Sequence, residues 1–173
     1  TEEYVCLGLF GPKSRQLLTD VFGDEFKTST FPFGTGKYLN LQGVSIWFQR
    51  LSYVGELGWE LYIPIQHAKK IYHYLIKAGT SYDLIHAGAH AMDIMRMEKM
   101  YLHWGHDISP AENPFEAGLG FAARLEKEED FIGKQALLKI QKIPLKKQLV
   151  MLTINDSKPG HPLLLHDEPI YCD

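Results

Sequence analysis

The chain has few of the residues that mark several large classes of protein. It contains only two cysteines, Cys6 and Cys172, which lie at opposite ends of 173 residues without the paired spacing of a zinc or redox site. With so few cysteines, a reducing compartment is the default expectation. No apolar run approaches the roughly 20 residues that a membrane-spanning helix needs. We therefore predict neither a cysteine-based metal centre nor a membrane protein.

An excess of positive charge is also missing. Lysine and arginine number 18 against 21 aspartates and glutamates, which gives a net charge of −3. Binding to a polyphosphate backbone requires a basic face, so nucleic acid is not an expected partner. The sequence also lacks a Gly-x-Ser-x-Gly elbow, a phosphate-binding glycine loop and a dinucleotide-binding fingerprint. These absences remove the common serine-nucleophile and nucleotide-binding classes.

What the chain does contain is an irregular alternation of strand-like and helix-like segments. Hydrophobic residues make up 45% of it and charged residues 23%, as in ordinary soluble globular proteins. Strands are predicted over Val5–Phe10, Tyr38–Leu41, Val44–Tyr53 and Trp59–Ile63. Helices are predicted over Lys13–Phe22, Gln66–Ala78, His86–Met100 and Phe131–Ile140. Hairpins mixed with two long helices favour an α+β fold over a doubly wound sheet.

The two long helices differ in how clearly they show a buried face. In residues 66–78 the side chains expected to face inward recur at helical spacing: Ala68, Ile71, Tyr72 and Leu75. Residues 86–100 carry four methionines, which suit either the irregular gaps of a core or a cofactor site, and we favour the core. Arg96 and Glu98 on the same helix are expected to form a structural ion pair or cap.

The most informative segment is residues 51–64, LSYVGELGWELYIP. Glycines at 55 and 58 predict a tight reversal between two strands. Alternation then places Trp59, Leu61 and Ile63 on one face, and Glu60 and Tyr62 on the other. Two interpretations fit this pattern. One is a half-buried hairpin with a polar outer face, and the other is a site for a flat heterocycle whose N–H groups donate to a carboxylate.

Two further groups of residues are candidates for chemistry. Glu56 and Glu60 are the possible carboxylate acceptors, while Tyr53, Tyr62 and Phe121 offer aromatic area for stacking. His103, His106 and Asp107 lie within five residues of one another. They have no second cluster to complete a metal coordination shell, so we expect polar groups that cap a helix end and predict no metal site.

Four ordered segments together resemble the aminomethyltransferase (glycine cleavage T-protein) family. They are residues 52–62 (SYVGELGWELY), 95–108 (MRMEKMYLHWGHDI), 113–120 (NPFEAGLG) and 130–137 (DFIGKQAL). The similarity begins at residues 7–12 (LGLFGP) and extends over nearly the whole chain. Within this family the chain looks most like the folate-binding C-terminal half of dimethylglycine and sarcosine dehydrogenases.

The resemblance implies a tetrahydrofolate site. Glu60 aligns with the carboxylate that binds the pterin ring, and Tyr53 and Phe121 align with residues that line the same site. Leu61 and Tyr62, which follow Glu60, complete the predicted set. Two positions depart from the family: Met92 stands where T-proteins have an arginine, which leaves the contact to the folate tail unassigned, and Phe121 replaces a tyrosine.

The resemblance also implies a reaction and its partners. Folate would capture the one-carbon unit released from a methylamine substrate, giving 5,10-methylenetetrahydrofolate. The catalytic aspartate of the family and the FAD-binding region of the dehydrogenases would lie upstream of this chain. Other domains of a longer parent chain are therefore expected partners, and this chain alone is expected to be inactive. The expected location is the cytoplasm for a bacterial protein and the mitochondrial matrix for a eukaryotic one.

Both ends look cut from a longer protein. We expect residues 1–143 to form the folate-binding domain and residues 144–173 to begin a small β-barrel domain, with a first strand over Gln148–Ile154. A different class of function remains open. The regulatory subunit of pyruvate dehydrogenase phosphatase resembles the same family, so a non-catalytic regulatory or assembly module is the alternative. An upstream flavin-binding fingerprint and a suitable aspartate would favour the enzyme.

Overall fold

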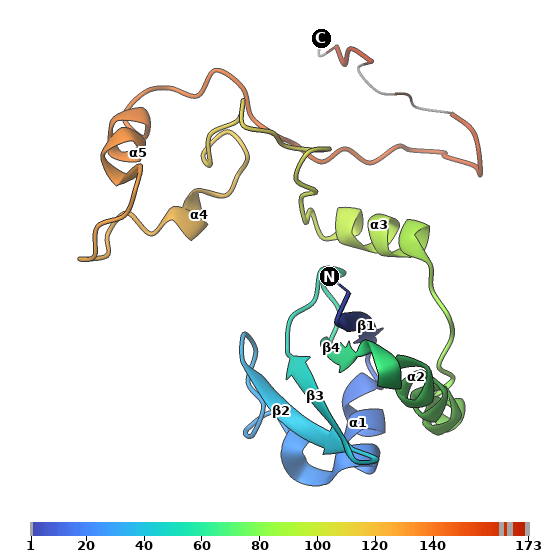
Figure 1. Cartoon of the computed structure of the whole chain (residues 1–173). Coiled ribbons are helices and arrows are strands. Elements are labelled where there is room, and N and C mark those ends of the chain that lie inside the picture. Colours follow the sequence, from blue (N-terminus) through green and yellow to red (C-terminus); the bar gives the residue numbers. More distant parts are fainter. Residues whose placement is uncertain (1, 163–164, 166–167, 172–173) are drawn as a thin grey trace. The chain divides into compact units, whose positions relative to one another are not determined.

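The computed structural model describes residues 2–162, 165 and 168–171, so Cys172 lies outside the described residues. The chain divides into two compact units, residues 1–103 and 104–173, and the first unit contains the sheet seen in Figure 1. Four antiparallel strands with helices confirm the predicted α+β class. The predicted domain division at residue 143 differs from the division into these units and stays a prediction.

The sheet has the strand order β1-β4-β3-β2. Its strands are β1 (Tyr4–Phe10), β2 (Gly36–Leu41), β3 (Val44–Gln49) and β4 (Gly58–Pro64). The β2–β3 hairpin is closed at Gln42 (φ 53°) and Gly43 (φ 81°). Positive φ at both central residues is the geometry of a type I′ turn, whose twist matches that of the flanking strands. A hairpin between the predicted strands Tyr38–Leu41 and Val44–Tyr53 is thus confirmed.

The tight turn predicted before β4 is wrong. β3 ends at Gln49 rather than at Tyr53, and residues 50–57 form a longer connection. Arg50 still pairs with the residues before β2, because its amide donates to Thr35 O at 2.9 Å and its carbonyl accepts from Gly34 N at 3.0 Å. The next amide, Leu51 N, donates back to Gln49 O at 3.0 Å, so the chain turns out of the sheet at this point.

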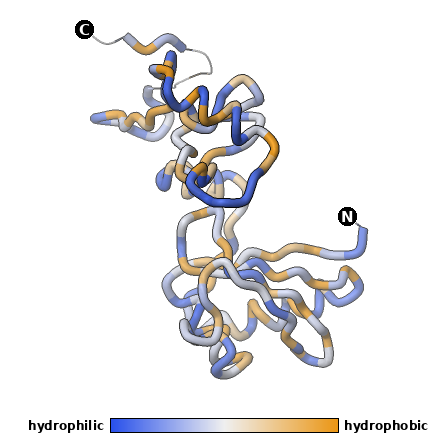
Figure 2. Tube along the Cα trace, turned by 90° about the vertical axis from the view of Figure 1, so that its left-hand side faces the viewer, coloured by the Kyte–Doolittle hydropathy of each residue, from blue (hydrophilic) through white to orange (hydrophobic). Residues whose placement is uncertain are grey.

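The core lies on one face of the sheet, beneath α1 (Ser14–Phe22), the short 3-10 helix η1 (Gly23–Phe26) and α2 (Ile65–Gly79). The predicted alternation in β4 is confirmed, because Trp59, Leu61 and Ile63 are buried while Glu60 and Tyr62 are half-buried. Figure 2 shows hydrophobic positions interspersed with polar ones along this unit. The side chains that fill the core are Leu17, Leu18, Phe26, Phe31, Ile46, Phe48, Trp59, Leu61, Ile63 and Ile71.

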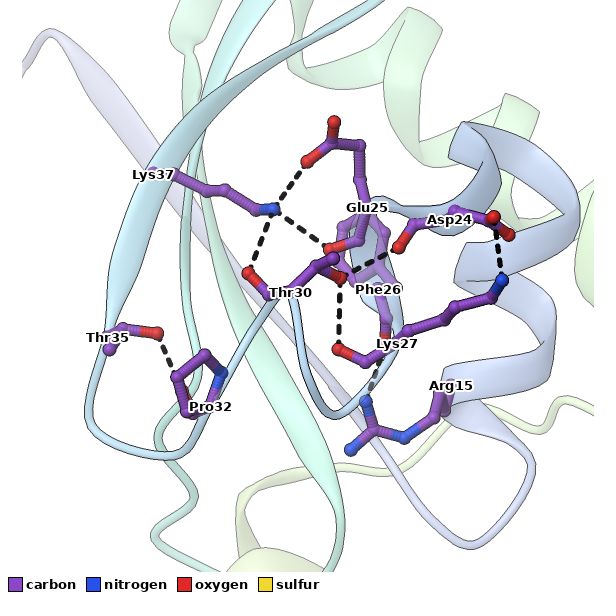
Figure 3. A network of polar contacts seen from close by, with 9 residues as sticks. All are labelled: Arg15, Asp24, Glu25, Phe26, Lys27, Thr30, Pro32, Thr35 and Lys37. Atoms are coloured by element: carbon purple, nitrogen blue, oxygen red, sulfur yellow. Dashed lines mark hydrogen bonds and ion pairs between the residues drawn. The ribbon is translucent and has the colours of Figure 1, made fainter.

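Polar contacts hold η1 and the loop after it against β2 (Figure 3). Lys37 on β2 reaches Glu25 Oε2 at 2.5 Å and Glu25 O at 2.9 Å. Thr30 Oγ1 donates to Asp24 O at 2.7 Å, and the Arg15 guanidinium donates to Phe26 O. The loop that carries Phe26 and Phe31 into the core is therefore fixed at both of its ends.

The long helices form with two corrections. In α2, Ile71 and Leu75 are buried as predicted, but Tyr72 is 36% exposed and its hydroxyl lies 3.1 Å from His86 Nδ1. The second helix, α3 (Ala89–Glu98), is shorter than residues 86–100, because a 3-10 turn, η2 (Thr80–Tyr82), and an extended Gly88 precede it. The prediction that the methionines of residues 86–100 lie in the core is wrong, because Met92, Met97 and Met100 are exposed.

The second unit contains α4 (Gly120–Ala123) and α5 (Lys134–Ile140), of which α5 confirms the later part of the predicted helix over residues 131–140. The strand predicted over Gln148–Ile154 is not formed in these described residues. A strand requires a neighbouring strand to complete its hydrogen bonds, whereas Leu149 N donates here to Glu116 O, at 2.9 Å, in a segment that is not a strand. Across residues 2–162, 165 and 168–171, no helix is long and apolar enough to cross a bilayer.

Candidate functional site

The candidate site lies on the face of the sheet opposite the core. Strand register places Tyr62 on the central strand β4 directly between Cys6 of β1 and Trp47 of β3. In the next row on this face, Glu60 lies between Gly8 and Gln49. Glu60 and Tyr62 therefore share one face, as the alternation predicted.

Glu60 is a half-buried carboxylate with a defined partner. The Tyr62 hydroxyl donates to Glu60 Oε2 at 2.7 Å. This hydrogen bond, together with partial burial, raises the pKa of Tyr62 to about 12, because ionising the phenol would place two anions side by side. Burial and the charge of Glu60 likewise raise the pKa of the Cys6 thiol, an effect that a hydrogen bond with Tyr62 partly offsets. The cluster thus presents one carboxylate acceptor beside two neutral groups.

Aromatic rings lie on the same face as this carboxylate, at positions where glycines leave room for them. A β-carbon on Gly36 would meet the Trp47 ring at 2.3 Å, and β-carbons on Gly8 and Gly58 would meet the Phe10 ring at 2.4 and 2.3 Å. Trp47 also packs on Tyr38, with ring centroids 4.9 Å apart. Sequence reasoning missed Phe10 and Trp47. The sequence does contain a hint of both rings: a glycine within a predicted strand lies two residues from an aromatic residue, or opposite one on the neighbouring strand.

The other predicted site residues are placed differently. Tyr53 lies in the 50–57 connection, where its hydroxyl donates to Leu102 O at 3.1 Å. Leu61 is 0% exposed on the core face, so its side chain cannot contact a ligand on the outer face, and its predicted role in ligand binding stays a prediction for its backbone alone. Phe121 belongs to α4 of the second unit and is 81% exposed. Within the first unit the structure thus brings Glu60 and Tyr62 together, while Tyr53 lies in the connection before β4 and the Leu61 side chain lies in the core.

A cavity of about 690 Å³ lies in the same unit. Its lining is mainly apolar and includes Leu17, Val54, Met92 and Met95, but none of the five predicted site residues. It reaches Gly8 and Phe10, which pair in the sheet with Glu60 and Gly58. The carboxylate site therefore borders this cavity without being part of its wall.

The 50–57 connection is tied to the residues at the end of α3. Glu56, the second candidate acceptor, lies 3.4 Å from Lys99 Nζ, so its carboxylate is already in an ion pair. Arg96 is buried, at 2% exposure, and contacts Asp93 at 2.7 Å and Tyr101 O at 3.1 Å. The structural ion pair predicted for Arg96 is confirmed, with Asp93 as its partner. Arg96 thus stabilises the helix end and is not exposed to a ligand.

The histidine cluster forms local contacts. His106 Nδ1 lies 3.3 Å from Asp107 Oδ1. Within the part of the chain that the structure describes, no three His, Cys, Asp or Glu side chains are grouped to hold a metal ion.

The chain is similar in sequence to parts of several longer enzymes. Human mitochondrial sarcosine dehydrogenase is 38% identical over 159 residues, which cover 92% of this chain and 17% of that protein. The 4-methylaminobutanoate oxidase (formaldehyde-forming) of Paenarthrobacter nicotinovorans is 35% identical over 173 residues, 100% of this chain and 21% of that protein. The aminomethyltransferase of Halothermothrix orenii is 39% identical over 173 residues, 98% of this chain and 46% of that protein.

The chain spans 17% to 46% of the length of these three relatives. A family match covers most of the chain itself, because the GCVT N-terminal domain matches residues 1–127. The chain belongs to the GCVT N-terminal domain family.

Proposed function

We propose that this chain is a tetrahydrofolate-binding module of a one-carbon transfer enzyme, with Glu60 as the acceptor for the pterin ring. The observation that carries the proposal is the Glu60 carboxylate, oriented by Tyr62 at 2.7 Å on an aromatic face of the sheet. Membership of the GCVT family supports the same ligand.

The chemistry of the ring matches that of the site. An aminopyrimidinone presents a ring N–H and an exocyclic NH₂ side by side, and a carboxylate can accept both through its two oxygens. Trp47 and Phe10 offer flat apolar area on the same face of the sheet as Glu60, and such area favours stacking with a heterocycle. A contribution from Tyr53 belongs to the proposal, and the role of Phe121 stays a separate prediction.

The names of the relatives indicate the reaction that we propose for the whole protein. Sarcosine dehydrogenase, dimethylglycine dehydrogenase and aminomethyltransferase all act on small amines by name. We propose that another part of the whole protein first oxidises the methylamine by two electrons to an iminium ion. Folate bound at Glu60 then takes up the iminium carbon, which releases the demethylated amine and a proton and gives 5,10-methylenetetrahydrofolate. No residue of this chain is proposed as the catalytic group, and FAD is not part of the proposed site.

The test is folinate binding by the longest natural chain that carries these residues. Trp47 lies on the proposed face, so its fluorescence is a better reporter than that of Trp59, which is buried in the core. Loss of a charged hydrogen-bond acceptor typically costs about 1.5–3 kcal/mol, so Glu60→Ala is expected to weaken binding roughly 10- to 150-fold.

Glu128→Ala, an exposed position in the second unit, is the matched control and is expected to leave the affinity unchanged. Equal affinity in Glu60→Ala and the unaltered protein would contradict the role of Glu60. A complete absence of folinate binding by the unaltered protein would favour the alternative of a non-catalytic module.

A further inference from the structure

The Tyr62–Glu60 pair is a polar contact that the fold does not require. Both residues are half-buried on the outer face, whereas the core lies on the opposite face. A single hydrogen bond at a partly exposed position adds little to the stability of a sheet that is held by a full core. Its defined geometry, 2.7 Å from the hydroxyl to one named carboxylate oxygen, therefore calls for another explanation.

We propose that Tyr62 is a positioning residue whose hydroxyl fixes the Glu60 carboxylate in the orientation that accepts two parallel N–H donors. This inference rests on the proposed function, because it names the group that prepares the pterin acceptor. It also changes the role predicted for Tyr62 from the sequence, which was to supply stacking area.

The sheet holds Tyr62 in place from both sides. β4 is a central strand, and the residues directly opposite Tyr62 are Cys6 on β1 and Trp47 on β3. Side chains paired in this way have β-carbons about 4.5–5.5 Å apart, so each restricts the other. The Tyr62 ring is thereby confined, and its hydroxyl stays within reach of Glu60, two residues earlier on the same strand.

The negative charge of Glu60 also stabilises its hydrogen bond with the Tyr62 hydroxyl. The pKa of Tyr62 is raised to about 12, so the phenol keeps its proton at neutral pH and remains a donor. A hydrogen bond to an ionised oxygen is stronger than a neutral one, which opposes rotation of the carboxylate. A carboxylate offers about four lone-pair sites. After Tyr62 occupies one of them on Oε2, both oxygens can still accept from a ligand.

The inference predicts a selectivity that stacking alone would not produce. A ligand with both N–H donors binds more tightly to a carboxylate that is already oriented, whereas a ligand with one donor gains little affinity. Folinate should therefore bind more tightly than its 2-desamino analogue, and the Tyr62 hydroxyl should account for part of the difference. Ordering one side chain in advance is worth roughly 3- to 10-fold in affinity.

The experiment compares Tyr62→Phe with Tyr38→Phe, both assayed with folinate and with the 2-desamino analogue. Each substitution removes one hydroxyl and keeps the ring, and Tyr38 lies on the same face beside Trp47. Tyr62→Phe is expected to weaken folinate binding roughly 3- to 10-fold and to reduce the preference for folinate. Tyr38→Phe should leave that preference intact. An unaltered preference in Tyr62→Phe would overturn the inference.

A measurement without ligand separates failure of this inference from failure of the proposed function. With ¹³Cζ-labelled tyrosine, the Tyr62 phenol should remain protonated at about pH 11, and Glu60→Gln should let it ionise there. Loss of folinate affinity in Glu60→Ala but not in Tyr62→Phe would refute the positioning role alone. No loss in Glu60→Ala would refute the proposed function, whatever the titration shows.

Discussion

The indole ring of Trp47 occupies the space that a side chain at Gly36 would need, since a β-carbon on Gly36 would stand 2.3 Å from Trp47 Cζ2. The two residues lie on neighbouring strands, with Trp47 paired directly to Tyr38. Phe10 has the same relationship with Gly8 and Gly58. Glycine at these positions therefore determines where the aromatic rings of the outer face lie.

Gly36→Ala is expected to destabilise the protein by forcing the Trp47 ring to move. Overpacking of this kind costs about 1–3 kcal/mol, and the partly exposed ring places this site toward the lower value. Urea denaturation followed by circular dichroism measures the change. In a protein that already carries Trp47→Ala, Gly36→Ala should lower the free energy of unfolding much less, because the indole ring is absent. Equal costs in the two backgrounds would show that the ring does not create the constraint.

Local chemistry was enough to predict much of the sheet. Two strand-like runs separated by only Gln42 and Gly43 identified the β2–β3 hairpin, and strict alternation identified the two faces of β4. The connection before β4 was predicted wrongly although it also contains glycines. Its course depends on Arg50, whose guanidinium bonds to Phe31 O, and on Tyr53, whose hydroxyl bonds to Leu102 O. Such partners are distant in sequence, and no local pattern reveals them.

The candidate site was predictable only along a single strand. Alternation placed Glu60 and Tyr62 together, whereas Cys6 and Trp47 join them through cross-strand register. Register depends on how the whole sheet pairs, so neither residue was identified from the sequence. Leu61 was included because it adjoins Glu60 and matches the family segment, although the same alternation assigns it to the core.

For helix α3 the sequence predicted the helix but not which of its residues are buried. Its periodicity predicted a helix correctly, but periodicity does not tell which side is covered. The buried residue is Arg96, whose partners include Asp93 and Tyr101 O, while Met92 and Met97 are exposed. A hydrophobicity pattern ranks arginine last for burial, so it could not find this contact.

Leu61→Ala distinguishes a core role from a ligand-binding role. Leu61 is fully buried, and truncating such a leucine typically costs about 2–5 kcal/mol through lost contacts and the cavity left behind. The free energy of unfolding should fall by this amount in chemical denaturation. Ile65→Ala, at an exposed position in the same unit, should change it by less than about 0.5 kcal/mol. Normal stability with weakened folinate binding would instead restore the role predicted from the sequence.

Two ion pairs near the end of α3 should differ in their contribution to stability. Arg96→Leu leaves Asp93 without its 2.7 Å partner and removes a donor to Tyr101 O, which is expected to cost about 1–3 kcal/mol. Lys99→Met removes a contact of 3.4 Å to Glu56 between side chains that are 43% and 35% exposed, and exposed pairs contribute about 0–1 kcal/mol.

Hydrogen exchange of the amides at residues 96–101 measures how each of the two substitutions affects the stability of this segment. Faster exchange in Arg96→Leu than in Lys99→Met is the expected result. Similar exchange in both variants would mean that burial of Arg96 does not anchor the segment.

The turn at residues 109–112 should open in acid. Glu112 Oε1 contacts Lys147 Nζ at 2.5 Å, and its Oε2 accepts from the Ser109 amide and hydroxyl, both at 2.8 Å. Lys147 first, and then Ser109, lower the pKa of Glu112 from 4.5 to about 2. Because the folded pKa lies below the unfolded value, the stabilisation is complete above about pH 4.5 and is lost as the pH falls towards 2.

NMR titration of the Glu112 carboxyl carbon, with exchange of the Ser109 amide, measures both events. Lys147→Met removes the main cause of the lowered pKa, so the midpoint should rise and the Ser109 amide should lose protection at a higher pH. Lys146→Met removes the neighbouring charge but no contact to Glu112, and should leave the midpoint near 2. If Lys147→Met and Lys146→Met titrate alike, Ser109 alone holds the carboxylate, and the contact between residues 112 and 147 does not stabilise this unit.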